Sequence, residues 1–235
     1  MVWDTDVVSI IVLANVTKFF PNGTRALDDV SLQIDEREFV FLVGSSGAGK
    51  TTLIRLINRD TLPDSGSVFI ENVDVTRLRR RDVPRLRRRV GVVYQDYKLL
   101  QSLTVRQNVE FVLKATGELG GRSDRRVDEA LHMVGLSDRA GHRPNQLSGG
   151  EQQRAAIARA VVRRCPILVA DEPTGNLDQG TGWETIQLLV RINAIGTTVL
   201  MATHNRDVVD TMRRRVIEID RGRVVRDERG GGYEG

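Results

Sequence analysis

The sequence of 235 residues has one cysteine, few aromatic residues and no long hydrophobic run. The single Cys165 precedes an apolar run and cannot pair within the chain, which fits a buried thiol in a reducing cytosol. The stretch VVSIIVLA at 7–14 is interrupted by Ser9 and is far shorter than the roughly 20 residues that a membrane helix needs. Asp4 and Asp6 stand where a secretion signal would be basic. We therefore expect no transmembrane segment and no signal peptide.

Basic residues exceed acidic ones only slightly, by 35 to 31, but they are unevenly distributed. Eight of the thirteen residues between Arg77 and Arg89 are arginine, in a segment expected to be helical. A second basic cluster consists of Arg213, Arg214, Arg215, Arg221, Arg223, Arg226 and Arg229. We favour solvated surfaces with ion pairs as the explanation, and the alternative is contact with anionic lipid headgroups or an acidic partner. No aromatic residues alternate with the arginines to stack on bases, so we expect no nucleic-acid partner.

A glycine-rich loop, GSSGAGKTT at 44–52, follows the apolar run FVFLV and precedes a helical pattern. This order of strand, loop and helix makes its G-x-x-x-x-G-K-T pattern a credible phosphate-binding loop. Its glycines permit backbone angles that turn successive N–H groups into one concavity, and the following helix adds its positive end. Lys50 is then predicted to reach the β- and γ-phosphates of a nucleotide, and the Thr51 hydroxyl to hold Mg²⁺.

Several polar residues follow apolar strands, at the strand ends where ligands collect in α/β sheets. Gln95 ends the run RVGVVYQ, and Asp171 and Glu172 follow ILVA. Because side chains alternate along a strand, we expect these two carboxylates to point apart, with Asp171 near Mg²⁺ and Glu172 orienting or deprotonating a water. His204 ends another apolar strand and is either a γ-phosphate contact or a satisfied polar residue.

The start of the chain has a different strand pattern from the strands around the phosphate loop. A strand at 9–16 and an alternating one at 29–34 flank a turn and predict a small antiparallel layer. Phe20, just before that turn, is either a core residue or a flat surface for an adenine ring. The tail GGGYEG at 230–235 is predicted to be mobile.

The segment from 96 to about 144 is predicted to be mainly helical, and another helix follows it. Ser148 and Glu151, three residues apart, form a capping box at the start of that helix. Gly149 and Gly150 lie between them and are poor choices for helix stability alone. We therefore expect them to expose bare N–H groups at the positive end of the helix, where a phosphate would bind.

In this order the motifs resemble those of the ABC-type ATPases over nearly the whole chain. The loop at 44–52 matches the Walker A motif, Gln95 the Q-loop, LSGGEQQR at 147–154 the family signature, ILVADEP at 167–173 Walker B, GNLD at 175–178 the D-loop, and His204 the switch histidine. The resemblance implies an α/β fold, with a P-loop NTPase (RecA-like) core, a small antiparallel β subdomain and an α-helical subdomain.

The resemblance also implies a nucleotide site made by two copies of the chain. ATP would contact Phe20, Gly44, Ser45, Ser46, Gly47, Ala48, Gly49, Lys50, Thr51 and Thr52; Mg²⁺ would contact Thr51, Gln95 and Asp171; and Glu172, His204 and Gln95 would be catalytic. Ser148, Gly149, Gly150 and Glu151 would reach the nucleotide of a second copy in an ATP-bound, head-to-tail homodimer, with Asp178 in the D-loop between them. Phe20 stands where the family usually has an adenine-stacking tyrosine.

The resemblance further implies one ABC ATP-binding domain over 1–235. Its catalytic core would comprise 1–95 and 160–235, and a helical lobe at 96–159 would couple to an integral membrane partner at the cytoplasmic face. Stretches such as VYQDYKLLQSLTVRQNV at 93–109 are similar to subunits that act in bacterial cell division, where the output is control of cell-wall hydrolases. The alternatives are a subunit of a lipoprotein- or macrolide-export transporter and, less favoured, a soluble ABC ATPase that acts on nucleic acid.

Overall fold

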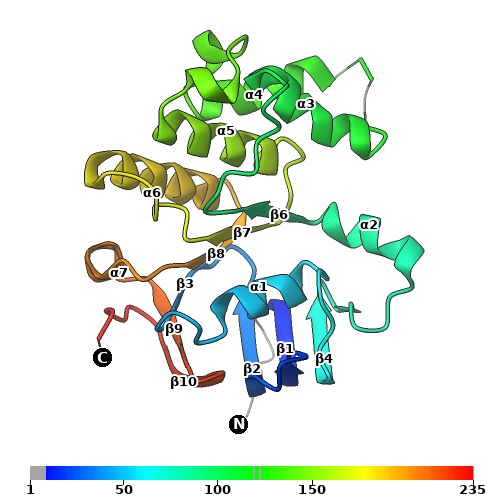
Figure 1. The fold of residues 1–235 in the computed structure, drawn as a ribbon, viewed down its shortest axis with the longest axis vertical. Coiled ribbons are helices and arrows are strands. Elements are labelled where there is room, and N and C mark those ends of the chain that lie inside the picture. Colours follow the sequence, from blue (N-terminus) through cyan, green and yellow to red (C-terminus); the bar gives the residue numbers. More distant parts are fainter. Residues whose placement is uncertain (1–8, 119, 122, 235) are drawn as a thin grey trace.

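The computed structural model describes residues 9–118, 120–121 and 123–234, and it stacks two β-sheets and several helices in layers (Figure 1). From the top of Figure 1, a group of helices lies over a further helix, then a core sheet, a helix beneath it and an antiparallel sheet at the bottom. The residues that bear on a signal peptide, 1–8, lie outside the described ranges. Within those ranges, no helix combines the length and the apolar character needed to cross a membrane.

The core sheet has six strands in the order β10-β9-β3-β8-β7-β6, all parallel except β10, which pairs antiparallel with β9. The bounds are β3 Phe39–Val43, β6 Val90–Val93, β7 Ile167–Asp171, β8 Thr198–Ala202, β9 Arg215–Asp220 and β10 Arg223–Glu228. Every residue of β3 and β8 is buried, as parallel strands covered on both faces require. Alternate residues of β3 enter different cores: Phe39 and Phe41 pack with α6, Gln179–Ala194, and Val40 and Leu42 with α1, Lys50–Ile57.

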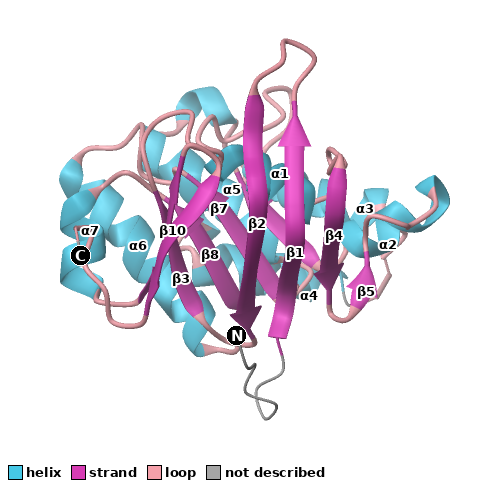
Figure 2. Cartoon of the chain, turned by 90° about the horizontal axis from the view of Figure 1, so that it is seen from below, coloured by secondary structure: helices cyan, strands magenta, loops and turns pink. Residues whose placement is uncertain are grey.

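The antiparallel sheet has the order β2-β1-β4-β5 and crosses one side of the core sheet (Figure 2). Its strands are β1 Ser9–Phe19, β2 Arg25–Asp35, β4 Ser65–Ile70 and β5 Val73–Asp74. The predicted antiparallel layer is therefore confirmed, with both of its first strands longer than expected. Its inward side chains share a hydrophobic core with α1, so the helix that follows the phosphate loop is held between the two sheets.

Three helices form the top layer of Figure 1: α3 Val105–Ala115, α4 Ser123–Met133 and α5 Gly149–Val161. The predicted capping box at the start of α5 is confirmed, because Ser148 Oγ accepts a hydrogen bond from the Glu151 N–H and Glu151 Oε2 accepts one from the Ser148 N–H. Apolar residues of all three helices join those of α6 in one core. The division into a core at 1–95 and 160–235 and a lobe at 96–159 stays a prediction.

The arginine-rich segment is less helical than expected. The 3-10 turn Arg80–Asp82 leads into α2, which covers only Val83–Arg87. Pro84 lies in the first turn of α2, where its missing N–H is not needed and its fixed φ starts a helix. Arg79, before the turn, is extended. The helix thus begins next to the proline, and the arginines before it lie in the 3-10 turn and in the extended segment that precedes that turn.

Arg215 at the start of β9 ties three parts of the fold together. Its guanidinium donates to Glu38 Oε2 at 2.7 Å, to both carboxylate oxygens of Asp227 at 2.8 Å, and to the backbone carbonyl of Gln33 at 2.8 Å. The Arg215 side chain is only 12% exposed. The hydrogen bonds to Asp227, together with the charge of Glu38, raise the pKa of Arg215 against the opposing effect of burial.

We expect Arg215→Ala to lower the free energy of unfolding by roughly 2 kcal/mol, because it removes a largely buried guanidinium that bonds the partly buried Glu38, Asp227 and the Gln33 carbonyl. Urea unfolding followed by circular dichroism measures the change. Arg125→Ala is the matched control: Arg125 is 81% exposed and pairs with Glu129 one helical turn away, so its loss should cost less than about 0.5 kcal/mol. Equal losses for the two variants would contradict the role given to Arg215.

Candidate functional site

The glycine loop between β3 and α1 has the backbone geometry that its sequence predicts. Gly44, Gly47 and Gly49 have φ angles of 142°, 79° and 119°, which side chains rarely permit. A Cβ atom at Gly44 would lie 2.1 Å from the carbonyl oxygen of Ile219, and one at Gly49 would lie 2.5 Å from that of Ala26. Two of the three glycines are therefore required by contact with neighbouring strands as well as by φ.

Lys50, the first residue of α1, directs its ammonium group back over this loop. The side chain is buried, and Nζ donates to the carbonyl oxygens of Gly44 at 2.7 Å and Ser45 at 3.0 Å. The loop N–H groups, the start of α1 and the Lys50 charge are thus concentrated in one place, and together they favour an anion.

The loop opens into a cavity of about 720 Å³ that gathers most of the predicted nucleotide contacts. The predicted residues that line it are Phe20, Gly44, Ser45, Ser46, Gly47, Gly49, Lys50, Thr51, Thr52, Gln95, Asp171, Glu172 and His204. They come from β7, from α1 and from the connections that follow β1, β3, β6, β7 and β8, yet meet on one surface. Phe20 is half-buried at the end of β1, so its ring is both packed and accessible to the cavity.

The two carboxylates differ in environment, but not for the reason expected. Asp171 is the last residue of β7, whereas Glu172 has a φ of 49° and has already left the strand. The expectation that alternation along the strand separates the two side chains was therefore wrong, because Glu172 is not part of the strand. Asp171 Oδ1 lies 3.4 Å from Thr51 Oγ1, and burial raises the pKa of the Asp171 carboxyl although the Thr51 hydroxyl acts in the opposite direction.

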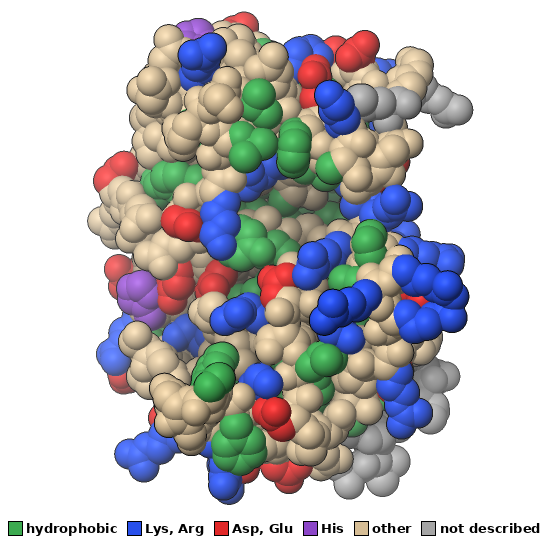
Figure 3. Space-filling model, turned by 45° about the vertical axis from the view of Figure 1, so that its right-hand side comes forward, with side chains coloured by type: hydrophobic (Ala, Val, Ile, Leu, Met, Phe, Trp, Pro, Cys, Tyr) green, Lys and Arg blue, Asp and Glu red, His purple; other side chains and the backbone are tan. Residues whose placement is uncertain are grey.

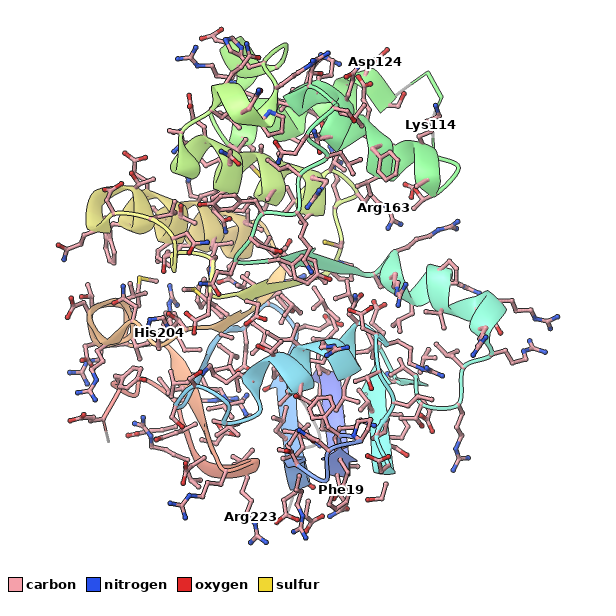
Figure 4. All side chains as sticks on the ribbon, in the orientation of Figure 1. Phe19, Lys114, Asp124, Arg163, His204 and Arg223 are labelled. Atoms are coloured by element: carbon pink, nitrogen blue, oxygen red, sulfur yellow. The ribbon has the colours of Figure 1, made fainter. Side chains whose placement is uncertain are left out.

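Glu172 pairs instead with His204. Glu172 Oε2 lies 2.9 Å from His204 Nδ1 and also accepts from the His204 backbone N–H at 3.3 Å. The carboxylate is 15% exposed and the imidazole 68% exposed, so the pair has one shielded and one open end. Figure 4 shows His204 beside α7, Arg206–Met212, where β8 has ended. Both groups line the cavity, so a water or phosphate there can meet either of them.

Gln95 lies in a loop, two residues after β6, and not at the strand tip that was expected. Its backbone carbonyl accepts a hydrogen bond from Asn176 Nδ2 at 3.0 Å. Its side-chain amide lies against Gly175, where a Cβ atom would be 2.8 Å from Gln95 Nε2. The loop after Glu172 therefore holds Gln95 in place.

The oxygen atoms near Thr51 suit a magnesium ion bound with a nucleotide. Thr51, Asp171 and Gln95 all line the cavity, and Mg²⁺ prefers a few protein oxygens together with waters and phosphates. In the described ranges, no group of three or more histidine, cysteine or acidic side chains is arranged to hold a metal without such help.

The residues at the start of α5 do not reach this cavity in a single chain. The cavity lining within the described residues includes none of 148–151. The hydrogen bond from the Ser148 N–H lowers the pKa of the Glu151 carboxyl. Arg139 Nε also donates to Glu151 Oε1 at 3.1 Å. Asp178, also outside the lining, caps α6 by accepting from the Thr181 N–H at 3.0 Å.

Gly150 has a structural reason that sequence reasoning missed. It is buried, and a Cβ atom there would lie 2.1 Å from Cγ2 of Thr181 on α6. The absence of a side chain thus lets two helices pack closely. Gly149 is more open, with a Cβ atom 3.3 Å from the Tyr97 hydroxyl as its nearest contact. The expectation that bare N–H groups are accessible at the start of α5 therefore stays a prediction for Gly149.

Tyr233 was not predicted as a site residue, yet it lines the cavity together with Thr24 and Ala26. Its N–H donates to Asp210 Oδ1 at 2.7 Å, and its ring lies 5.1 Å from the guanidinium of Arg206. The described part of the tail therefore packs on α7, and the expectation of a mobile tail was wrong for 231–234. No local sequence signal marks Tyr233, because Asp210 and Arg206, which hold its N–H and its ring, lie more than twenty residues away in the chain.

The protein-family model described as "ABC transporter" matches residues 27–175. The cell division ATP-binding protein FtsE of Streptococcus pneumoniae is 51% identical over 225 residues, which cover 96% of this chain and 98% of that protein. FtsE of Mycobacterium tuberculosis is 52% identical over 224 residues, with 95% and 97% covered. FtsE of Escherichia coli is 43% identical over 210 residues, with 89% and 95% covered.

Solved structures of ATP-binding cassettes share the fold. The dimeric, post-hydrolysis cassette MJ0796 bound to ADP and Pi has a TM-score of 0.84 and 39% identity, covering 94% of this chain and 99% of that chain. The cassette cbiO1 from Clostridium perfringens has a TM-score of 0.86 and 30% identity, with 94% and 89% covered. Both the sequence and the architecture are thus shared over nearly the full length.

We expect Lys50→Ala to weaken nucleotide affinity by about 10- to 100-fold, because charge-assisted hydrogen bonds contribute roughly 1.5–3 kcal/mol. Calorimetric titration with ATP measures the dissociation constant. Lys114→Ala is the matched control, because Lys114 lies on α3, far from the cavity (Figure 4). If both variants bind nucleotide as the wild type does, the loop is not the phosphate site.

Proposed function

This chain belongs to the ABC transporter family and is an ATPase, and we propose that it is the ATP-hydrolysing subunit of a membrane complex that acts in bacterial cell division. The observation that carries the proposal is the near full-length similarity, at 43–52% identity, to cell division ATP-binding proteins of several bacteria. The cavity beside the glycine loop supplies the chemistry, because it brings a phosphate-binding nest, two carboxylates and a histidine to one surface.

ATP is proposed to bind with its phosphates in the glycine loop and its adenine ring against Phe20. The loop N–H groups and Lys50 then contact the phosphate oxygens, and Ser46 and Thr52 line the same cavity. Thr51, Asp171 and Gln95 are the residues that would hold Mg²⁺, which neutralises charge on the β- and γ-phosphates when bound. The hydroxyl of Thr51 and the carboxylate of Asp171 are already close enough to share one ligand.

Glu172 is proposed to orient and deprotonate the attacking water. Its carboxylate faces the cavity and its pairing with His204 fixes its position relative to the loop. When the γ-phosphate occupies the cavity, the exposed imidazole of His204 can contact it while Nδ1 stays with Glu172. A carboxylate held in this way first orients the water and then accepts a proton from it.

Ser148, Gly149, Gly150 and Glu151 are proposed to act on the nucleotide of a second copy. None of them lines the cavity of its own chain, and Ser148 at the N-terminus of α5 is exposed; both observations support an action across an interface. The cassette MJ0796 with ADP and Pi is dimeric. ATP would then join two copies of this chain head to tail, and hydrolysis would release them, with Asp178 in the interface.

The partner is proposed to be an FtsX-like integral membrane protein, reached from the cytoplasmic face, whose movement regulates cell-wall hydrolysis. A second hollow, of about 540 Å³, offers a place for it, lined in part by Arg55, Asp60, Tyr94 and Lys98. This hollow shares Gln95, Thr51 and Asp171 with the nucleotide cavity. A partner segment held there would therefore respond to the state of the nucleotide.

We expect Glu172→Gln to retain ATP binding and to lower turnover by about 10²- to 10⁴-fold, because a positioned base is lost. Phosphate release measures turnover, and gel filtration with ATP should show a persistent dimer. Glu36→Gln, at an exposed turn before β3, should behave as the wild type in both measurements. Normal turnover of the Glu172 variant would refute its role.

We expect the tagged chain, extracted from its own membranes in mild detergent, to co-purify with one integral membrane protein that mass spectrometry can identify. Lys98→Glu should reduce the yield of that protein, because Lys98 lines the second hollow, while Lys114→Glu on α3 should not. Recovery of a solute-export permease would contradict the cell-division role, and recovery of no membrane protein would contradict the membrane complex itself.

A further inference from the structure

The net charge of the molecule is concentrated in one short segment. Residues 77–89 hold eight arginines and one aspartate, a net charge of +7, while the whole chain carries +4. The rest of the chain therefore has a net charge of −3. A charge separation of this size orients a molecule in the field of a charged surface.

The arginines of this segment are all exposed to solvent. We call arginine surface the set Arg77, Arg79, Arg80, Arg81, Arg85, Arg87, Arg88 and Arg89, all of which are exposed. Leu86 is buried and Leu78 packs against the core that contains α1, so the segment is anchored by its apolar residues. Figure 1 shows α2 projecting from the side of the molecule, and Figure 3 shows basic side chains gathered along that edge.

Ion pairs account for only half of the arginine surface. Arg77, Arg79, Arg87 and Arg89 pair with Asp74, Asp82, Asp60 and Glu71, respectively. Arg88 donates to the carbonyl oxygen of Thr116. Arg80, Arg81 and Arg85 have no acidic partner and no side-chain hydrogen bond within the described ranges. Ion pairs therefore leave three exposed cations of the arginine surface, Arg80, Arg81 and Arg85, without an acidic partner among the described residues.

We propose that the arginine surface binds the anionic headgroups of a phospholipid bilayer. Guanidinium groups match phosphate oxygens in pairs of parallel hydrogen bonds, and basic segments next to a membrane are attracted by its negative surface potential. The segment contains no aromatic residue, so it lacks the stacking platform of a single-strand nucleic-acid site. That the chain lies near a bilayer rests on the proposed function. The lipid contact goes beyond that function, because the contact is made by this chain and not by its membrane partner.

The contact would orient the subunit as well as attract it. α2 leads into β6, an edge strand of the core sheet, and the Arg87–Asp60 pair joins α2 to the second hollow. Binding through Arg80, Arg81 and Arg85 would therefore hold the β6 edge, with the hollow beside it, toward the membrane. The antiparallel pair β9–β10 at the other end of the sheet would face away from it.

The test is sedimentation of the purified full-length chain with phosphatidylcholine vesicles that contain or lack phosphatidylglycerol, without any membrane protein. The wild type should bind the anionic vesicles only, and raising the salt concentration should release it because the contact is screened. One basic residue near such a surface contributes about fivefold in affinity, so R80Q/R81Q/R85Q should bind roughly 100-fold more weakly. The lysine variant R80K/R81K/R85K keeps the charge and should stay within about threefold of the wild type.

The matched control is the variant R37Q/R214Q/R221Q, which removes three exposed arginines outside the arginine surface that have no acidic partner among the described residues. Arg37 lies in the turn before β3, Arg214 just before β9, and Arg221 in the turn between β9 and β10. The control variant should bind the anionic vesicles within a few-fold of the wild type, because it changes only the net charge of the chain. Equal binding by the wild type and R80Q/R81Q/R85Q, an equal loss in the control, or equal binding to neutral vesicles would overturn the proposal. Tighter arginine-dependent binding to structured RNA than to anionic vesicles would overturn it in favour of a nucleic-acid surface. Because no membrane protein is present, the outcome is independent of the capture that tests the proposed function.

Discussion

The close contact of the phosphate loop with two different sheets is the constraint on which the site depends. Gly44 lies against the carbonyl oxygen of Ile219 in the core sheet, and Gly49 against that of Ala26 in the antiparallel sheet. The Gly222 N–H, in the turn that follows β9, donates to the carbonyl oxygen of Ala48 at 2.9 Å. The loop is thus fixed between the sheets before any ligand arrives, and its N–H groups need little reorganisation to meet an anion.

The parallel order of the core sheet then brings the other groups to this loop. β3, β8 and β7 are neighbours, so residues that follow their carboxyl ends converge even though they are far apart in the chain. Lys50, His204 and Asp171 meet in one cavity for this reason. Glu172 departs from the strand geometry, and its positive φ is what places its carboxylate against His204.

The same sheet separates the cavity beside the glycine loop from the arginine surface. The nucleotide cavity lies among the ends of the central strands, whereas the arginine surface lies beside the edge strand β6. The second hollow lies between them and shares residues with the cavity. The largely buried strands β3, β8, β7 and β6 lie side by side between these places.

The sequence alone determined those features that arise from short-range order. The spacing of glycines and lysine identified the loop, continuous apolar runs identified the parallel strands, and Ser148 with Glu151 identified the helix start. The tertiary structure decided what depends on contacts between distant segments. It shows that Gly150 is needed for packing against Thr181, that Gln95 is held by the loop at 175–176, and that Tyr233 belongs to the cavity. Local patterns record backbone preference and burial, but they contain no information on which remote surface a residue will meet.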